Sequence, residues 1–115
     1  MVAEVTKPTI DEARAAKLGA DAMARVELPS TGGWWCLNTR PAWGKLMNIR
    51  KAMSSNGHTE EDNINLILIE LTTEWSFADE VTADAIEKMD IEDIGAIMEV
   101  VNASILPLFE RMVKS

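Results

Sequence analysis

The strongest periodic pattern of apolar residues lies between Thr59 and Trp75. Five apolar residues recur there every three or four positions and share one face of an α-helix: Ile64, Ile67, Leu68, Leu71 and Trp75. Thr59 can cap the helix start, and the three acids that follow it suit the positive end of the helix dipole. We therefore predict a central helix over residues 59–75, with these five residues in the core. A buried strand over residues 65–71 is the alternative, but the apolar period continues past strand length.

The N-terminal segment has a helical pattern rich in alanine. Residues 1–8 show no periodicity and are expected to form a flexible arm. Thr9 and Glu12 match a capping box, which predicts a helix start at Ile10. We expect this helix over residues 9–24, with Gly19 weakening its middle. Because alanine buries little area, the helix is expected to pack loosely or against a partner.

Two short alternating runs flank a Pro/Gly turn at residues 29–32, which predicts a β-hairpin over residues 25–38. Trp35 and Leu37 share one face of the second strand, and Trp34 and Cys36 share the other. One tryptophan should therefore point inward and its neighbour outward. Trp34 is either a contact residue for a partner, since tryptophan is enriched at interfaces, or a cover for the hairpin that packs on a helix.

The remainder, residues 39–115, is expected to be helical. Thr39 and Pro41 are predicted to begin one helix, and Thr82 and Asp90 to cap two later ones. The last helix should end or kink at Pro107. Its predicted inner stripe consists of Ile91, Ile94, Met98, Val101 and Ile105, widened by Ile97. The predicted fold class is α+β and mostly helical: one domain over residues 1–115, with a small β-hairpin followed by a bundle of four to five helices.

Charge divides the chain into two unlike halves. The net charge is −8, with +3 on residues 1–58 and −11 on residues 59–115. The acidic half repels phosphate backbones, so we expect no nucleic-acid binding. A basic stretch without acids contains Arg40, Lys45, Arg50 and Lys51. It is either a solvated face that complements the acidic half internally or a docking patch for an acidic partner.

The residues that usually perform chemistry are scarce. A single His58 and a single Cys36 cannot assemble a His/Cys metal cluster, and no nucleotide-binding or hydrolase motif occurs. We interpret His58 as a loop residue, Cys36 as a small core residue, and the acids at 79–80 and 90–93 as helix caps. We expect no catalytic residue, metal or cofactor. No apolar run could span a bilayer and no signal peptide is present, so a cytoplasmic protein without membrane contact is expected.

The order of short patterns along residues 24–109 resembles a known family. The patterns are the two strand runs, Pro41-Ala42-Trp43, the aliphatic helix ending in Trp75-Ser76-Phe77, Asp79-Glu80-Val81-Thr82, Ala85-Ile86, Met89-Asp90, Asp93-Ile94, Ile97 and Leu106-Pro107-Leu108-Phe109. This layout resembles the small tail assembly chaperones of long-tailed bacteriophages. The resemblance implies a helical factor in the host bacterial cytoplasm that keeps the tape measure protein soluble, recruits tail tube protein and is absent from the virion.

Such a protein would need exposed apolar anchors and no chemistry. The predicted partner-binding residues are Trp34, Trp43, Phe77, Arg40, Lys45, Arg50 and Lys51, and a partner helix in an apolar groove is the expected mode. Trp75 is a further candidate anchor, for which we favour a core position. Self-association is also expected. The alternatives are a structural tail component such as a terminator or connector, a small enzyme using acids and His58, and a helical transcription regulator.

Overall fold

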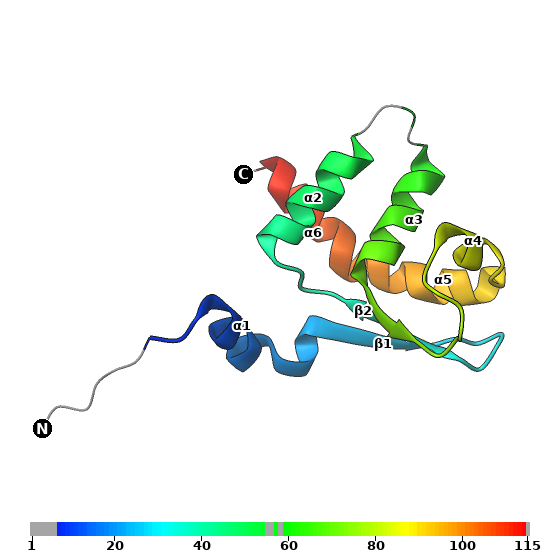
Figure 1. The fold of residues 1–115 in the computed structure, drawn as a ribbon, viewed down its shortest axis with the longest axis horizontal. Coiled ribbons are helices and arrows are strands. Elements are labelled where there is room, and N and C mark those ends of the chain that lie inside the picture. Colours follow the sequence, from blue (N-terminus) through cyan, green and yellow to red (C-terminus); the bar gives the residue numbers. More distant parts are fainter. Residues whose placement is uncertain (1–6, 55–56, 58, 115) are drawn as a thin grey trace, which may run out of the picture.

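Helices cover one side of a small sheet. The computed structural model describes residues 7–54, 57 and 59–114, so most of the predicted arm lies outside the described residues. In Figure 1 the strands lie at the base. Helices α2 (Trp43–Met53) and α3 (Glu60–Leu71) rise above them, and α5 (Ile91–Val100) runs nearly horizontally on the same side. The predicted fold class, α+β and mostly helical, is confirmed.

The sheet contains one strand more than the predicted hairpin. β1 (Met23–Glu27), β2 (Trp34–Asn38) and β3 (Thr72–Trp75) are antiparallel in the order β1-β2-β3. In this register Trp35 pairs with Val26 on one side and with Trp75 on the other. The hairpin itself is confirmed, although β1 begins at Met23, two residues before the predicted start. Central strand β2 is buried along its middle, as expected for a strand with neighbours on both sides.

The central helix is confirmed, but it is shorter than predicted. It begins after Thr59, whose hydroxyl accepts from the backbone N–H of Asp62, and it ends at Leu71 rather than Trp75. At Thr72 the backbone becomes extended, and the Thr72 hydroxyl donates to the carbonyl of Leu68 while accepting from Nε1 of Trp35 at 2.7 Å. Consecutive β-branched threonines favour a strand at this point, and β3 brings Trp75 to the sheet.

The alanine-rich helix is also shorter than predicted. α1 (Ile10–Leu18) has the predicted capping box between Thr9 and Glu12. It ends at Gly19, which has a φ of +50° that suits glycine, so this residue terminates the helix instead of weakening its middle. A 3₁₀ turn, η1 (Gly19–Ala22), leads into β1. No residue of α1 is buried, and Figure 1 shows the helix beside the end of the sheet, away from α3 and α5.

The C-terminal helices form one nearly continuous helical run. After α4 (Ala83–Glu87), α5 continues into a π-helical segment, η2 (Val101–Ile105), and then into α6 (Leu106–Lys114). The helix does not end at Pro107. The distortion precedes the proline, whose missing N–H cannot bond to the previous turn.

The predicted inner stripe of this run is wrong at its first residue. Ile91 is 79% exposed, and the residues that are buried at every fourth position are Asp93, Ile97, Val101 and Ile105. A spacing of four drifts around an ordinary helix of 3.6 residues per turn, and the wider turn of η2 offsets that drift.

The core centres on α3, β2 and the C-terminal run. Ile67, Leu68 and Leu71 are buried as predicted, whereas Ile64 and Trp75 are half-buried and pack against the core. The remaining fully buried apolar residues come from the hairpin and the neighbouring helices: Leu28, Trp35, Leu37, Ile49, Ile97, Val101 and Ile105. Helix α2 begins at Trp43, with Ala42 at its N-cap, and so starts later than the predicted Thr39 to Pro41.

Candidate partner-binding surfaces

The predicted partner-binding residues fall into two groups at opposite ends of β2. Trp34 begins β2 and lies next to Ser76, the residue before Phe77. The backbone N–H of Trp34 donates to the Ser76 hydroxyl, and the backbone N–H of Ser76 donates to the carbonyl of Trp34. Trp43 follows the other end of the strand, at the start of α2. The structure therefore places Trp34 and Phe77 at neighbouring backbone positions, and Trp43 at the other end of the strand.

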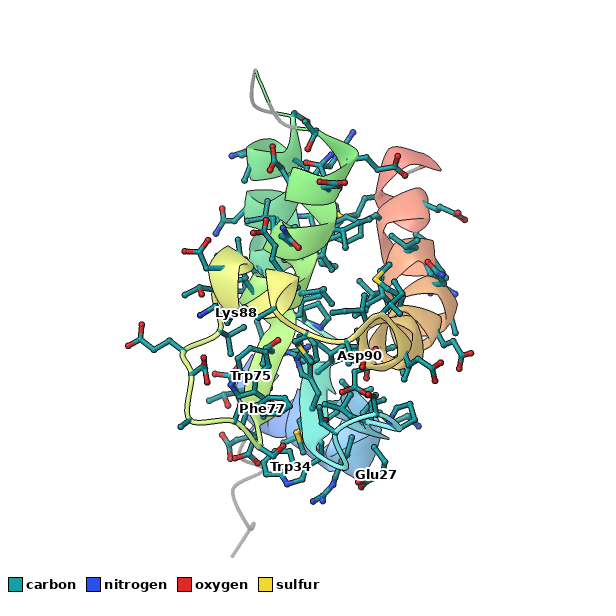
Figure 2. All side chains as sticks on the ribbon, turned by 90° about the vertical axis from the view of Figure 1, so that its right-hand side faces the viewer. Glu27, Trp34, Trp75, Phe77, Lys88 and Asp90 are labelled. Carbon is teal, nitrogen blue, oxygen red and sulfur yellow. The ribbon has the colours of Figure 1, made fainter. Side chains whose placement is uncertain are left out.

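An aromatic row begins in the core and runs out to the surface. The ring centroids of Trp35 and Trp75 are 5.1 Å apart at an interplanar angle of 71°, and those of Trp75 and Phe77 are 5.4 Å apart at 86°. Both are edge-to-face pairs, the geometry that aromatic quadrupoles favour. Figure 2 shows Trp34, Phe77 and Trp75 following one another along the end of the sheet. Nε1 of Trp75 donates to the backbone carbonyl of Asp79 at 2.8 Å, which holds the loop after β3 against the row.

Trp34 is half-buried and is covered by a cation. The guanidinium carbon of Arg25 lies 4.8 Å from the Trp34 ring centroid, and Nε of Arg25 bonds to Glu27 at 3.0 Å. At such an exposed site a cation–π contact contributes about 0.5–1 kcal/mol. Trp34 thus lies on the outer side of the hairpin, as the alternation predicts, with Arg25 from the neighbouring strand above its ring.

A pocket of about 380 Å³ opens beside the aromatic row. Its lining combines residues of β3, the following loop, α4, the segment that joins α4 to α5, and the turn between β1 and β2 (Figure 2): Thr31, Trp75, Phe77, Asp79, Ala85, Lys88, Met89 and Asp90. We call it the aromatic pocket. Asp90 accepts from the Ser30 hydroxyl at 2.6 Å, and this hydrogen bond lowers the pKa of the Asp90 carboxyl. Its carboxylate therefore stays charged at neutral pH.

A second pocket of about 320 Å³ lies on the other side of α4. It is bounded by α3, α4 and the start of α5, and its lining is mainly aliphatic: Glu61, Ile64, Asn65, Leu68, Ile86, Glu87, Met89, Ile91 and Ile94. We call it the three-helix pocket. Met89 lines both pockets, so the two hollows adjoin at this residue, just after the end of α4.

The basic residues do not form a single face. Lys45 pairs with Glu70 of α3 at 2.6 Å, which matches the interpretation that the basic stretch complements the acidic half internally. Arg40, Arg50 and Lys51 are exposed. At 3.6 residues per turn, Lys45 and Arg50 lie on opposite flanks of the buried Leu46 and Ile49, and Lys51 lies on the outer side of α2.

Trp43 is a large apolar side chain on the surface. It is 60% exposed, although its spacing with Leu46 suggests the inner side of α2. Its place at the first position of the helix puts it beyond the packed turns, next to the sheet-to-helix loop. Trp43 therefore has the exposure that a contact residue requires, and its partner-binding role stays a prediction.

Within the described part of the chain, the residues considered for catalysis or metal binding do not gather into one site. Among residues 7–54, 57 and 59–114, no three His, Cys, Asp or Glu side chains are grouped so that they could hold a metal ion. Cys36 is buried, and that burial, followed by the nearby Glu74, raises the pKa of its thiol. His58 lies outside the described residues. Asp90 caps α5 as predicted, but Asp93 is not a cap, because it is fully buried and binds the turn between β1 and β2.

Sequence reasoning missed both pockets. Asp93 could have been identified, since it is the one charged residue in step with Ile97, Val101 and Ile105 at intervals of four. The exposure of Ile91 was harder to predict. This residue directly follows the N-cap, so its side chain lies at the end of the helix rather than along its packed side. Nothing in the local sequence indicates that residues after β3 pack beside the chain after α4.

Comparisons of the chain with protein-family models, with curated proteins and with solved structures found no match. Across the residues that the structure describes, each helix is too short or too polar to cross a bilayer.

Proposed function

We propose that this chain is a non-enzymatic tail assembly chaperone of a bacteriophage. In this role it binds helical segments of the tape measure protein in the host bacterial cytoplasm, keeps that protein soluble, and helps recruit tail tube subunits to it. The order of sequence patterns that resembles this family supports the proposal. The alternative is a structural tail component that remains in the virion.

The observation that best supports a binding role is the pair of adjoining pockets beside α4. The three-helix pocket is lined mainly by aliphatic side chains, and Ile91 at its rim is 79% exposed. No described element of the chain covers this isoleucine. A helix-binding chaperone needs an apolar hollow that its own fold leaves open, since a partner helix buries its apolar face in such a groove.

Co-expression with the tape measure protein encoded near this gene tests the proposal directly. We expect the tape measure protein to become soluble and to co-purify with the chain. Trp43→Ala should reduce co-purification without unfolding the chain, because Trp43 is 60% exposed. Ile10→Ala, a change at an apolar residue of α1 that is 80% exposed, is the control and should leave co-purification unchanged.

Two results would contradict the chaperone role. One is a tape measure protein that stays insoluble and does not co-purify. The other is stoichiometric recovery of this chain from purified particles by mass spectrometry, which would favour the structural tail component. In the expected case, the chain is found in the cytoplasmic fraction of infected cells and is absent from particles.

A further inference from the structure

The two pockets beside α4 form one recognition surface with an apolar floor and an acidic rim. We infer that this surface binds a positively charged amphipathic helix, with the apolar side of that helix in the three-helix pocket and its basic side chains against the rim. This inference rests on the proposed function, because it specifies the kind of partner segment that the same surface accepts.

The floor fits the apolar side of a helix. Leu68 and Ile86 form its base and are buried, while Ile64 and Ile94 are half-buried at its sides and Ile91 stands at its rim. Both pockets are at the small end of the range of ligand sites, which is about 300–1,000 Å³. That size suits individual side chains of a partner, which an amphipathic helix presents at intervals of three or four residues.

The rim is acidic on both sides of α4. Glu61 and Glu87 border the three-helix pocket, and Asp79 and Asp90 border the aromatic pocket. Of the residues that the structure describes, Lys88 is the one cation that lines either pocket. Residues 79–92 as a whole contain six carboxylates and one lysine, a net charge of −5.

These rim carboxylates are available to a partner. Among the described residues, Glu61, Glu87 and Asp79 form no ion pair within the chain, and Asp90 bonds only to uncharged donors. A basic helix supplies the missing counter-charges, whereas an acidic one would meet like charges at the same place.

The aromatic pocket suits a basic side chain at the end of such a helix. Trp75 and Phe77 provide apolar and π-rich walls for the long stem of a lysine or arginine, and Asp79 and Asp90 provide carboxylates for its charge. In Figure 2, Lys88 lies above the two rings and Asp90 lies to their right. The single Lys88 leaves the pocket with an excess of negative charge.

Binding of a designed peptide tests this inference without any phage protein. The probe is a fluorescein-labelled peptide of leucine and lysine, about 18 residues long because shorter isolated helices are marginal in water. Its leucines are spaced to form one helical face. A peptide of the same composition with that spacing scrambled, and a leucine/glutamate peptide, are the controls. We expect fluorescence anisotropy to show binding of the amphipathic basic peptide alone.

Two pairs of variants locate the site. Ile91→Ser should weaken binding about tenfold, the equivalent of one apolar side chain withheld from the interface, while Ile10→Ser should have no effect. The two isoleucines are 79% and 80% exposed, and each is the first residue of its helix, so the pair is closely matched. Glu87→Lys should weaken binding about fivefold, and Glu99→Lys, which changes the net charge equally but lies outside both pockets, should not.

Equal binding of the scrambled peptide, or equal effects of the two variants in either pair, would overturn the inference and leave only general charge attraction. Sedimentation of the chain alone tests the other possible occupant of this surface, which is a second copy of the chain. If the chain dimerises and Ile91→Ser makes it monomeric, a second copy occupies the surface.

The proposed function can fail separately. If the chain binds the designed peptide but does not bind the tape measure protein, the chaperone role is contradicted and the inference about this surface is not. A tape measure protein that still co-purifies with Ile91→Ser and Glu87→Lys would support the role and refute this surface.

Discussion

Asp93 of α5 accepts a hydrogen bond of 2.7 Å from the backbone N–H of Ser30, in the turn between β1 and β2. Its second carboxylate oxygen accepts from the Thr31 hydroxyl at 2.8 Å, and Asp93 itself is fully buried. A buried carboxylate is stable only when its oxygens are satisfied, and here the donors lie 63 and 62 residues earlier in the sequence. The pair fixes the hairpin turn against the start of α5 and places Thr31 in the wall of the aromatic pocket.

Removing this carboxylate should destabilise the fold. We expect Asp93→Ala to lower the free energy of unfolding by about 1.5–3 kcal/mol, since two hydrogen bonds to a charged acceptor are lost but the exposed Ser30 and Thr31 can bond to water instead. Asp93→Asn keeps one acceptor oxygen and should lose about half as much. Urea denaturation measures both, and Glu99→Ala is the exposed control on α5, with an expected change within about 0.5 kcal/mol. An Asp93→Ala variant as stable as the control would show that the turn is held by other contacts.

Local patterns predicted most elements, and non-local contacts account for the errors. Caps at Thr9, Thr59 and Thr82, and the alternation of the hairpin, depend on neighbours in sequence and are confirmed. The error at Trp75 has a physical reason: it lies four residues after Leu71, so it satisfies the helical period although it sits in a strand. Its pairing with Trp35, forty residues earlier, is invisible to any local rule.

The candidate site was less predictable than the fold. Trp34, Trp43 and Phe77 could be chosen as apolar residues at positions that allow exposure, but the pockets arise where α3, α4, α5 and the loop after β3 meet. The sequence shows that residues 59–115 are acidic, and one of our two interpretations of the basic stretch was that it pairs with them inside the chain. Of that stretch, Lys45 does pair with the acidic half, at Glu70.

Gly33 is required because the chain after β3 approaches it closely. A Cβ atom at Gly33 would lie 2.5 Å from Oγ of Ser76 and 3.2 Å from Cζ of Phe77. The Ser76 hydroxyl also accepts from the backbone N–H of Trp34, so turning it aside would break that hydrogen bond. We expect Gly33→Ala to destabilise the chain by about 1–2 kcal/mol and to change the tryptophan fluorescence of the aromatic row.

Gly44 provides the opposite case. It lies in α2, and a Cβ there would meet nothing within 4 Å. Gly44→Ala should therefore stabilise the chain by about 0.5–1 kcal/mol, because alanine restricts the unfolded chain and favours a helix. Thermal and urea unfolding of the two variants side by side measure the contrast. Stabilisation of both variants would contradict the packing described around Gly33, and destabilisation of both would contradict the open space at Gly44.

Cys36 should be nearly inert while the chain is folded. It is 3% exposed, and burial raises the pKa of its thiol, so little reactive thiolate is present at neutral pH. We expect an aromatic disulfide reagent to react with it at least about a hundredfold more slowly in buffer than in denaturing urea. A Cys36→Ala chain that carries Ala78→Cys in the exposed loop after β3 is the control and should react at similar rates in both. Rapid labelling of native Cys36 would mean that the sheet opens readily at β2.

Asp90 should make stability depend on pH in the acid range. The hydrogen bond from Ser30, followed by that from the backbone N–H of Glu92, lowers its pKa below the ordinary value of 3.8. Because the folded pKa is depressed, the contribution to stability is complete above pH 3.8 and is lost as the pH falls through the folded pKa. Asp90→Asn retains a good N-cap but cannot ionise. Its loss in free energy of unfolding, relative to the unmodified chain, should therefore be constant above pH 3.8 and shrink below that pH. The pKa of Glu12 is lowered in the same way by Thr9, and Glu12→Gln in both chains removes that background. Urea denaturation at a series of acidic pH values measures the difference, and a deficit that stays constant throughout would show that the Ser30 bond does not favour the charged form.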